Sequence, residues 1–227
     1  MKIFDLRVVR GHTFIGSHLD SSSVVVDCGA HRGEFSASIL TTYGCKCYLI
    51  EANPVLASAI DIHGVQTVYH GAVSAHDGEA VFVFQENPES GGLASVAEGN
   101  LGNGTRIRTI SLTSFMRLMK LEEIDLLKLD VEGAEFELLM SEPIQTLQKV
   151  KQITVEFHDF MPRFRVGRPY EKCMAKLEQA GFVPIQMAFR THGDVLLLNK
   201  MHFRDSFLRL LMMRLLGRFV KKLGMLS

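Results

Sequence analysis

The fold follows first from the stretch VVVDCGAHRGE at residues 24–34. Its three β-branched valines predict a strand, and this strand ends at Asp27. Gly29 and Gly33 then permit a tight turn and a close approach of the backbone to a ligand before a helix begins. Because ligands of open α/β sheets bind outside the carboxyl ends of the strands, the stretch predicts an α/β fold with a ligand loop after its first strand.

Outward from this stretch, short apolar runs alternate with amphipathic ones, as an α/β domain requires. The predicted strands are 24–26, 47–50, 65–73, 80–84, 106–112, 124–130, 153–157, 182–189 and 195–198, and the predicted helices are 34–42, a helix starting at Pro54, 113–119, 135–140 and 170–180. Residues 190–194 are too few for a parallel crossover, so the last two strands are expected to be antiparallel. The loop 87–105, rich in Gly, Ser and Asn, is expected to be a mobile connection between extra strands. The sequence thus predicts a mostly parallel sheet with a C-terminal antiparallel hairpin, in one domain over residues 1–200.

Composition limits the class of protein. The chain has 227 residues, 47% of them hydrophobic, which is enough for one α/β domain with a buried core. Its formal net charge is zero, but residues 201–227 hold six basic residues and one acid, so residues 1–200 are net negative. We therefore expect no nucleic acid partner. The four cysteines lack disulfide or zinc-finger spacing, and neither a signal peptide nor a long apolar run is evident, so a cytoplasmic location is expected.

The C-terminal segment 201–227 is expected to form a basic amphipathic helix. On a helical wheel, Arg214, Arg218, Lys221 and Lys222 lie on one side, opposite a wide apolar face. This composition is typical of a helix lying at a membrane surface. The alternative is that residues 203–226 pack on the domain itself or on the second copy of a homodimer.

Glu51 supports the prediction of a ligand loop. It ends the second predicted strand, 18 residues after Gly33, where an acid can bind both hydroxyls of a ribose. Asn53 and Pro54 shape the exit from this position. A nicotinamide enzyme would need glycine where this loop has Asp27, and an acid there instead suits a cationic ligand, such as the ammonium group of a methionine moiety.

The strand that begins at residue 124 ends in charged residues. If it runs through Glu132, then Lys128, Asp130 and Glu132 share one face. Charged side chains at the centre of a parallel sheet require an ion-pair partner or a ligand, because an unpaired buried charge costs several kcal/mol. Lys128 fits either a structural ion pair or a site, whereas Asp130 is expected to be functional.

The next strand brings a histidine to the same edge. Glu156 and His158 share a face there, and His158 is the expected general base, oriented by Asp130 or Glu156. Together with Asp159, the same side chains could instead hold a divalent metal with open positions, although no metal ligand is assigned. The remaining histidines considered are expected to be solvated loop residues: His12, His18, His63 and His76.

These segments together resemble the FkbM family of methyltransferases that use S-adenosylmethionine (SAM). The resemblance is carried by residues 25–33, 50–54, 155–158 and above all 127–135, LKLDVEGAE. It implies a class I methyltransferase fold, which is Rossmann-like, with SAM as donor and usually a hydroxyl acceptor on a sugar or natural product. The expected cofactor-binding residues are Asp27, Gly29, Ala30, Gly33, Glu51, Asn53, Asp130 and Glu132, and the expected catalytic residues are His158, Asp130 and Glu156.

The expected function is therefore methyl transfer to a hydroxyl of a saccharide, glycolipid or natural product. Two alternatives remain: a nucleotide-cofactor oxidoreductase, and a non-catalytic SAM-binding module that associates with membranes. Two features depart from the family pattern. Cys28 is unusual beside Asp27, and few residues precede the first strand, so acceptor recognition is expected to depend on loop 87–105 and the C-terminal segment.

Overall fold

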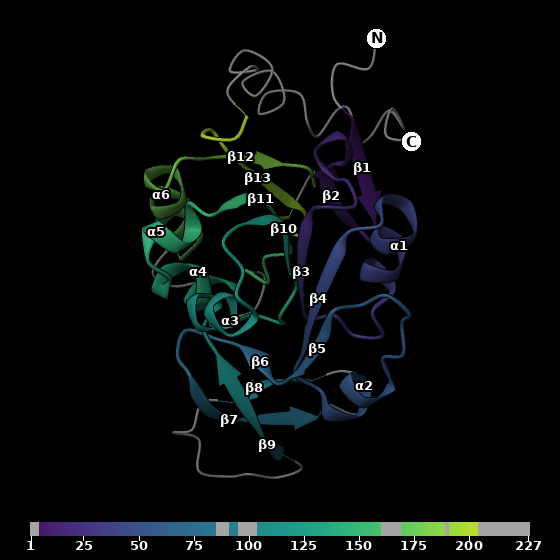
Figure 1. Cartoon of the computed structure of the whole chain (residues 1–227). Helices are drawn as coiled ribbons and strands as arrows, with labels where there is room; N and C mark the ends of the chain where they lie inside the picture. The colour runs from purple at the N-terminus through teal and green to yellow at the C-terminus, as the bar shows by residue number, and fades with distance from the viewer. Residues whose placement is uncertain (1–4, 85–90, 95–103, 160–168, 189–190, 204–227) are drawn as a thin grey trace.

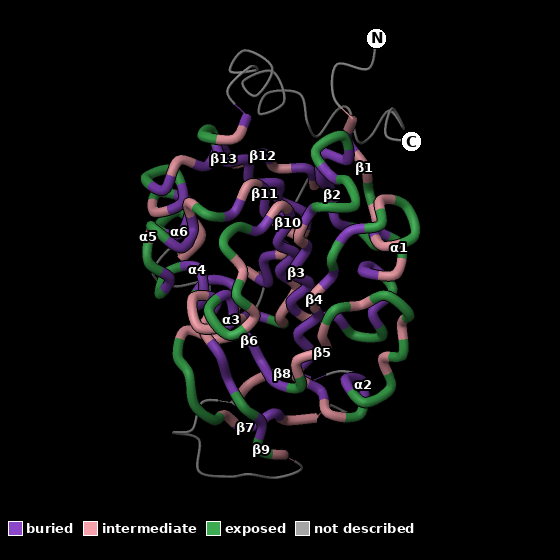
Figure 2. Tube along the Cα trace, in the orientation of Figure 1, coloured by how far each residue is buried: buried purple, intermediate pink, exposed green. Residues whose placement is uncertain are grey.

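A computed structural model describes residues 5–84, 91–94, 104–159, 169–188 and 191–203. These residues form a central sheet, a smaller second sheet and an N-terminal hairpin (Figure 1). Among the described residues, the central strands are the most deeply buried (Figure 2).

The central sheet has seven strands in the order β12-β13-β11-β10-β3-β4-β5. They span Val24–Cys28 (β3), Lys46–Glu51 (β4), Thr67–His70 (β5), Ile124–Leu129 (β10), Val150–Val155 (β11), Phe182–Gln186 (β12) and Val195–Asn199 (β13). β13 lies between β11 and β12 and is antiparallel to both, while β3, β4, β5, β10 and β11 pair in parallel. The predicted mostly parallel sheet with an antiparallel C-terminal hairpin is confirmed.

Helices cover both faces of this sheet. α1 (Glu34–Tyr43) packs on one face, through Phe35 and Ile39 against alternate residues of β3, β4 and β10. The other face is covered by α3 (Leu112–Met119), α4 (Glu135–Ser141), α5 (Ile144–Leu147) and α6 (Pro169–Gln179). α2 (Pro54–Ala59) begins where the Asn53 side chain accepts hydrogen bonds from the amides of Val55 and Leu56.

The second sheet was only partly predicted. It has the order β6-β9-β7-β8, from Ala72–Val73 (β6), Gly78–Phe84 (β7), Gly91–Ala94 (β8) and Gly104–Ile110 (β9). The predicted strand 65–73 is therefore wrong as a single unit: it divides at Gly71, where β5 ends and the chain crosses into the second sheet. β8 lies inside the predicted loop 87–105, and the remainder of that loop is outside the described residues except Gly104 and Thr105, the first two residues of β9.

The N-terminal hairpin was not predicted. β1 (Leu6–Val9) and β2 (His12–Ile15) are antiparallel, and a 3-10 turn, η1 (Gly16–His18), follows. Thr13 donates hydrogen bonds to Asp194 from its amide (3.1 Å) and its hydroxyl (2.6 Å), and the amide of Ile15 donates to Gln152 (2.9 Å). These bonds dock the hairpin on β11 and beside β13.

This hairpin corrects the prediction for His12. The side chain is not solvated but 2% exposed, because the hairpin places it against the central sheet. His18, His63 and His76 are exposed, as predicted. The predicted helix at 203–226 lies outside the described residues except for Phe203, and in the described part of the chain no helix is long and apolar enough to span a membrane.

Replacing Asp194 with Ala should lower the free energy of unfolding by about 2 kcal/mol, because two buried donors of Thr13 lose their charged acceptor. Urea denaturation measures this change. Thr13→Ser keeps both donors and should stay close to wild type. An Asp194→Ala protein as stable as wild type would show that these bonds do not hold the hairpin.

Candidate active site

The loop after β3 passes very close to the end of β10. Gly29 has a φ of +77°, and a Cβ added there would lie 1.7 Å from the carbonyl oxygen of Asp130. The amides of Gly29 and Ala30 both donate to the carbonyl of Ile50 (2.9 and 3.1 Å). Glycine is therefore required at position 29, because a side chain would separate β10 from the loop.

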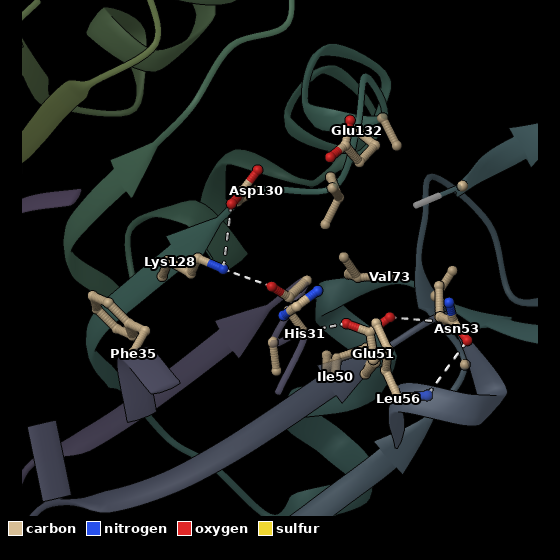
Figure 3. A pocket seen from close by; sticks show the side chains of 18 of the residues that line it. His31, Phe35, Ile50, Glu51, Asn53, Leu56, Val73, Lys128, Asp130 and Glu132 are labelled. Carbon is tan, nitrogen blue, oxygen red and sulfur yellow. Dashed lines mark hydrogen bonds and ion pairs between the residues drawn. The ribbon is translucent and has the colours of Figure 1, made fainter. Parts of the chain in front are cut away.

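A cavity of about 310 Å³ opens beside this loop (Figure 3). Six of the predicted cofactor-binding residues line it: Gly29, Ala30, Glu51, Asn53, Asp130 and Glu132. Asp27 and Gly33 are not among the lining residues. Other lining residues were not predicted, including Arg10 and His12 from the hairpin and Phe82 and Leu93 from the second sheet. The sequence pattern around the ligand loop does not indicate these residues, because they come from distant parts of the chain.

Asp27 and Lys128 form a buried ion pair. They are register partners on β3 and β10, and Lys128 Nζ lies 3.1 Å from Asp27 and donates to the carbonyl of Gly29 (2.6 Å). Ser36 of α1 also donates to Asp27 (2.7 Å). Burial opposes the charge on Lys128, but the Asp27 and Asp130 carboxylates outweigh it and raise the pKa of Lys128. The positive charge beside Asp27 is therefore the ammonium group of Lys128 and not a cationic ligand. Of the two roles expected for Lys128, it has that of a structural ion pair.

Glu51 faces the cavity from the end of β4. The amide of His31 donates to one of its carboxylate oxygens (2.6 Å) and the amide of Asn53 to the other (2.7 Å), as Figure 3 shows. Burial raises the pKa of Glu51, and these two backbone bonds oppose that rise. The bonds fix the carboxylate, and each oxygen keeps a further lone pair for a ligand hydroxyl.

Glu132 reaches the cavity from a turn, not from a strand. Lys128, Asp130 and Glu132 would share one strand face only if the strand ran through Glu132, and this condition is not met, because β10 ends at Leu129. Glu132 has a φ of +55°, which is unusual for a residue with a side chain. The fully buried Glu135 holds the turn, because it accepts hydrogen bonds from the amides of Val131 (3.0 Å) and Gly133 (3.1 Å).

His158 is oriented by Glu135. Its Nδ1 donates to Oε1 of Glu135 (2.8 Å), so the orienting carboxylate is neither Asp130 nor Glu156. Its Nε2 lies 3.5 Å from Glu132 and 4.0 Å from Asp130, two residues that line the cavity. Burial opposes the charge on His158, but the bond to Glu135 and the surrounding carboxylates raise its pKa to about 9.

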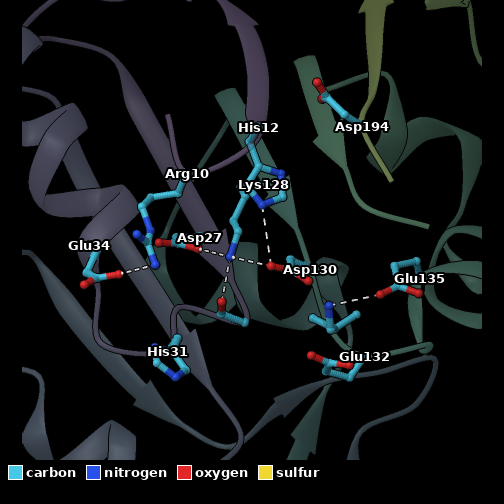
Figure 4. A network of polar contacts seen from close by, with 12 residues as sticks. Arg10, His12, Asp27, His31, Glu34, Lys128, Asp130, Glu132, Glu135 and Asp194 are labelled. Carbon is cyan, nitrogen blue, oxygen red and sulfur yellow. Dashed lines mark hydrogen bonds and ion pairs between the residues drawn. The ribbon is translucent and has the colours of Figure 1, made fainter. Parts of the chain in front are cut away.

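Asp130 lies between two histidines. His12 Nε2 is 3.5 Å from one of its carboxylate oxygens and His158 Nε2 is 4.0 Å from the other, and Figure 4 shows the His12 ring turned toward Asp130. Burial would raise the pKa of Asp130, but the contacts with His12 and Lys128 lower it to about 2. Asp130 is therefore ionised at neutral pH.

Asp159 does not belong to this group. It forms a hydrogen bond with His192, whose ring stacks on Tyr170. The groups whose donor atoms come together instead are His12, Asp130 and Glu156 on one side, and Asp130, Glu132 and His158 on the other.

The cavity suits SAM chemically. The glycine cradle at Gly29 admits a close ligand, Glu51 offers an acceptor for ribose hydroxyls, and the apolar side chains of Leu56, Val73 and Phe82 line another part of the wall. Asp130 and Glu132 add the negative charge that favours a sulfonium ion. A volume of about 310 Å³ is within the usual range for small-molecule sites.

The family comparison agrees with this chemistry. The family model described as "Methyltransferase FkbM domain" matches residues 27–200. No curated protein matches the chain significantly. Among solved structures, precorrin-6y C5,15-methyltransferase from Geobacter metallireducens is 15% identical, with a TM-score of 0.40 and coverage of 81% of this chain and 82% of that one.

Two further solved structures are similar to the chain. A SAM-dependent methyltransferase from Aquifex aeolicus is 12% identical, with a TM-score of 0.38 and coverage of 80% and 83%. Fibrillarin from Aeropyrum pernix, solved with natively bound SAM, is 10% identical, with a TM-score of 0.40 and coverage of 79% and 66%.

Gly29→Ala should lower the free energy of unfolding by more than about 3 kcal/mol, because a left-handed backbone and an overlap with Asp130 combine. Gly44→Ala is a matched control. Its φ is +70°, but its Cβ would meet nothing closer than 3.5 Å, so its cost should be about 1 to 2 kcal/mol. Equal losses in chemical denaturation would contradict the close approach at Gly29.

Proposed function

The chain belongs to the FkbM family of methyltransferases and uses SAM as its methyl donor, and from this premise we propose that it methylates a hydroxyl of a saccharide, glycolipid or natural product. The observation that carries the proposal is the hydrogen-bonded pair of His158 and Glu135. His158 lies next to Asp130 and Glu132, which line the cavity. A hydroxyl must lose its proton during methylation, and an oriented histidine beside the transfer site is suited to accept it.

The donor side of the site uses fixed backbone and one carboxylate. Gly29, Ala30 and the first turn of α1 would hold the methionine end of SAM, and Glu51 would hold the ribose. Bound SAM supplies a methyl group on a positively charged sulfur, which is open to attack in line by an oxygen. Asp130 and Glu132 would lie beside that positive charge and help to orient the methyl group.

The acceptor side of the site would remove the proton of the acceptor hydroxyl. The acceptor oxygen would form the new C–O bond, the electron pair of the broken C–S bond would stay on sulfur, and Nε2 of His158 would take the hydroxyl proton. The carboxylates around His158 favour its protonated form in the unliganded protein, so it serves as a base only when a positive charge in the cavity offsets them. Glu135 keeps Nδ1 protonated and thereby leaves Nε2 as the reacting atom.

The two alternatives are less well supported. An oxidoreductase using a nucleotide cofactor would need a glycine where Asp27 pairs with Lys128. A non-catalytic, membrane-associated module would leave the His158–Glu135 pair without a role. The proposed partners are a small-molecule or glycan acceptor and no nucleic acid. We also propose a cytoplasmic location, with the membrane or homodimer contact of residues 203–226 as a separate proposal.

Binding of SAM should raise the melting temperature of the protein, whereas NAD should leave it unchanged, because a ligand stabilises only the state that binds it. A SAM concentration of about 100 times its Kd should add about 2.7 kcal/mol. Differential scanning fluorimetry with each compound measures the shift. Stabilisation by NAD and not by SAM would favour the oxidoreductase.

Replacing His158 with Ala should lower turnover by roughly 10²- to 10⁴-fold while the Kd for SAM stays near the wild-type value. The assay is release of S-adenosylhomocysteine with an acceptor chosen from a panel of hydroxyl compounds. Glu135→Gln keeps an acceptor for Nδ1 but removes the charge, so it should retain part of the turnover. Unchanged turnover in His158→Ala would refute the assignment of His158 as base.

A further inference from the structure

His12 has a nitrogen whose role neither the fold nor the donor site explains. The side chain is 2% exposed, and its Nδ1 has no hydrogen-bond partner among the described residues. A buried polar atom without a partner costs about 1 to 3 kcal/mol, so the fold holds the His12 ring at this position without full compensation from hydrogen bonds. The ring packs edge-on against Phe35 and belongs to the docked hairpin, so it is held in place.

Two carboxylates stand next to this ring. Asp130 lies 3.5 Å from His12 Nε2, which is longer than the 2.7 to 3.2 Å of a usual N–H···O hydrogen bond. Glu156, the first residue after β11, brings a third donor, and the three donor atoms all lie within 4.8 Å of one another. Ligand atoms bound at about 2.1 Å from one metal ion are roughly 3 to 4 Å apart, so this spacing is close to that of a coordination sphere.

The local charge also favours a cation. Lys128 pairs with Asp27 and also lies 3.7 Å from Asp130, while Asp130, Glu132, Glu135 and Glu156 place four carboxyl groups around this one ammonium and the two histidines. Like charges at these distances repel, and a divalent ion between Asp130 and Glu156 would relieve that repulsion.

We propose that His12, Asp130 and Glu156 bind one divalent transition-metal ion at the edge of the cavity. One imidazole nitrogen and two carboxylate oxygens suit Mn²⁺, Fe²⁺ or Zn²⁺ better than Mg²⁺ or Ca²⁺, which prefer oxygen alone. His12 and Asp130 line the cavity, so the open positions of the ion would face it. His12 also lies outside residues 27–200, the part of the chain that the family model matches.

The role of the ion rests on the proposed function. Coordination of an acceptor hydroxyl to the ion would make its proton more acidic, and His158 lies on the other side of Asp130 to receive that proton. Binding of the ion itself does not depend on any acceptor, so the two proposals can fail separately.

The test is a titration of chelator-washed full-length protein with MnCl₂, without SAM or acceptor, followed by electron paramagnetic resonance of free Mn²⁺. We expect one Mn²⁺ per chain, and a loss of affinity of roughly tenfold or more in Asp130→Asn, Glu156→Gln and His12→Gln. His192→Ala is the matched control. This histidine also contacts a carboxylate, that of Asp159, but lies outside the triad, so its affinity for Mn²⁺ should equal wild type.

Two results would overturn the proposed metal site, and a third would overturn the role of the ion. The first is the absence of stoichiometric Mn²⁺ binding by wild-type protein. The second is wild-type affinity in His12→Gln combined with a loss in His158→Ala and Glu132→Gln, which would assign the ion to the other group. The third concerns the role alone: methyl transfer to a hydroxyl that is unaffected by chelator would refute the role of the ion and leave the proposed function intact. Thermal melting of each variant checks that a loss does not come from unfolding.

Discussion

The buried ammonium of Lys128 is the constraint on which the site depends. It contacts the carbonyl of Gly29 and the carboxylates of Asp27 and Asp130, so it joins the ends of β3 and β10. Loss of one partner from such a buried pair typically costs 3 to 5 kcal/mol, because a charge is left without compensation. The glycine loop and Asp130, which both line the cavity, are therefore held as one unit.

The sequence predicts the parts of this unit that are local. A run of valines ending at Asp27, a glycine turn and an acid at the end of the next strand are separated by fixed numbers of residues, and parallel pairing brings the strand ends to one edge. The alternation of Lys128 with Asp130 likewise indicated a polar strand end. The pairing of β3 with β10 places Lys128 opposite Asp27, and the pattern along a single strand cannot predict this register.

Contacts between distant segments could not be predicted in the same way. Thr13 and Asp194, which dock the hairpin, are 181 residues apart, and nothing in the short segment around His12 distinguishes a docked hairpin from a solvated loop. The partner of His158 was missed for a related reason. Glu135 begins a helix, and its role at the site depends on a backbone turn with a positive φ at Glu132, which periodicity does not reveal.

The two sides of the cavity are therefore built on different physical principles. The proposed donor side consists mainly of backbone and of Glu51, fixed by amides at the ends of the central strands, so it depends on the glycine turn and on the acid at the end of β4. The other walls come from elements attached to the central sheet: Arg10 and His12 from the hairpin, Phe82 and Leu93 from the second sheet. Because Arg10, Phe82 and Leu93 are side chains on peripheral elements, they can change without disturbing the Lys128 unit, whereas His12 contacts Asp130 of that unit. Selection among acceptors is therefore expected to reside in the hairpin and the second sheet, while the central sheet keeps the donor in place.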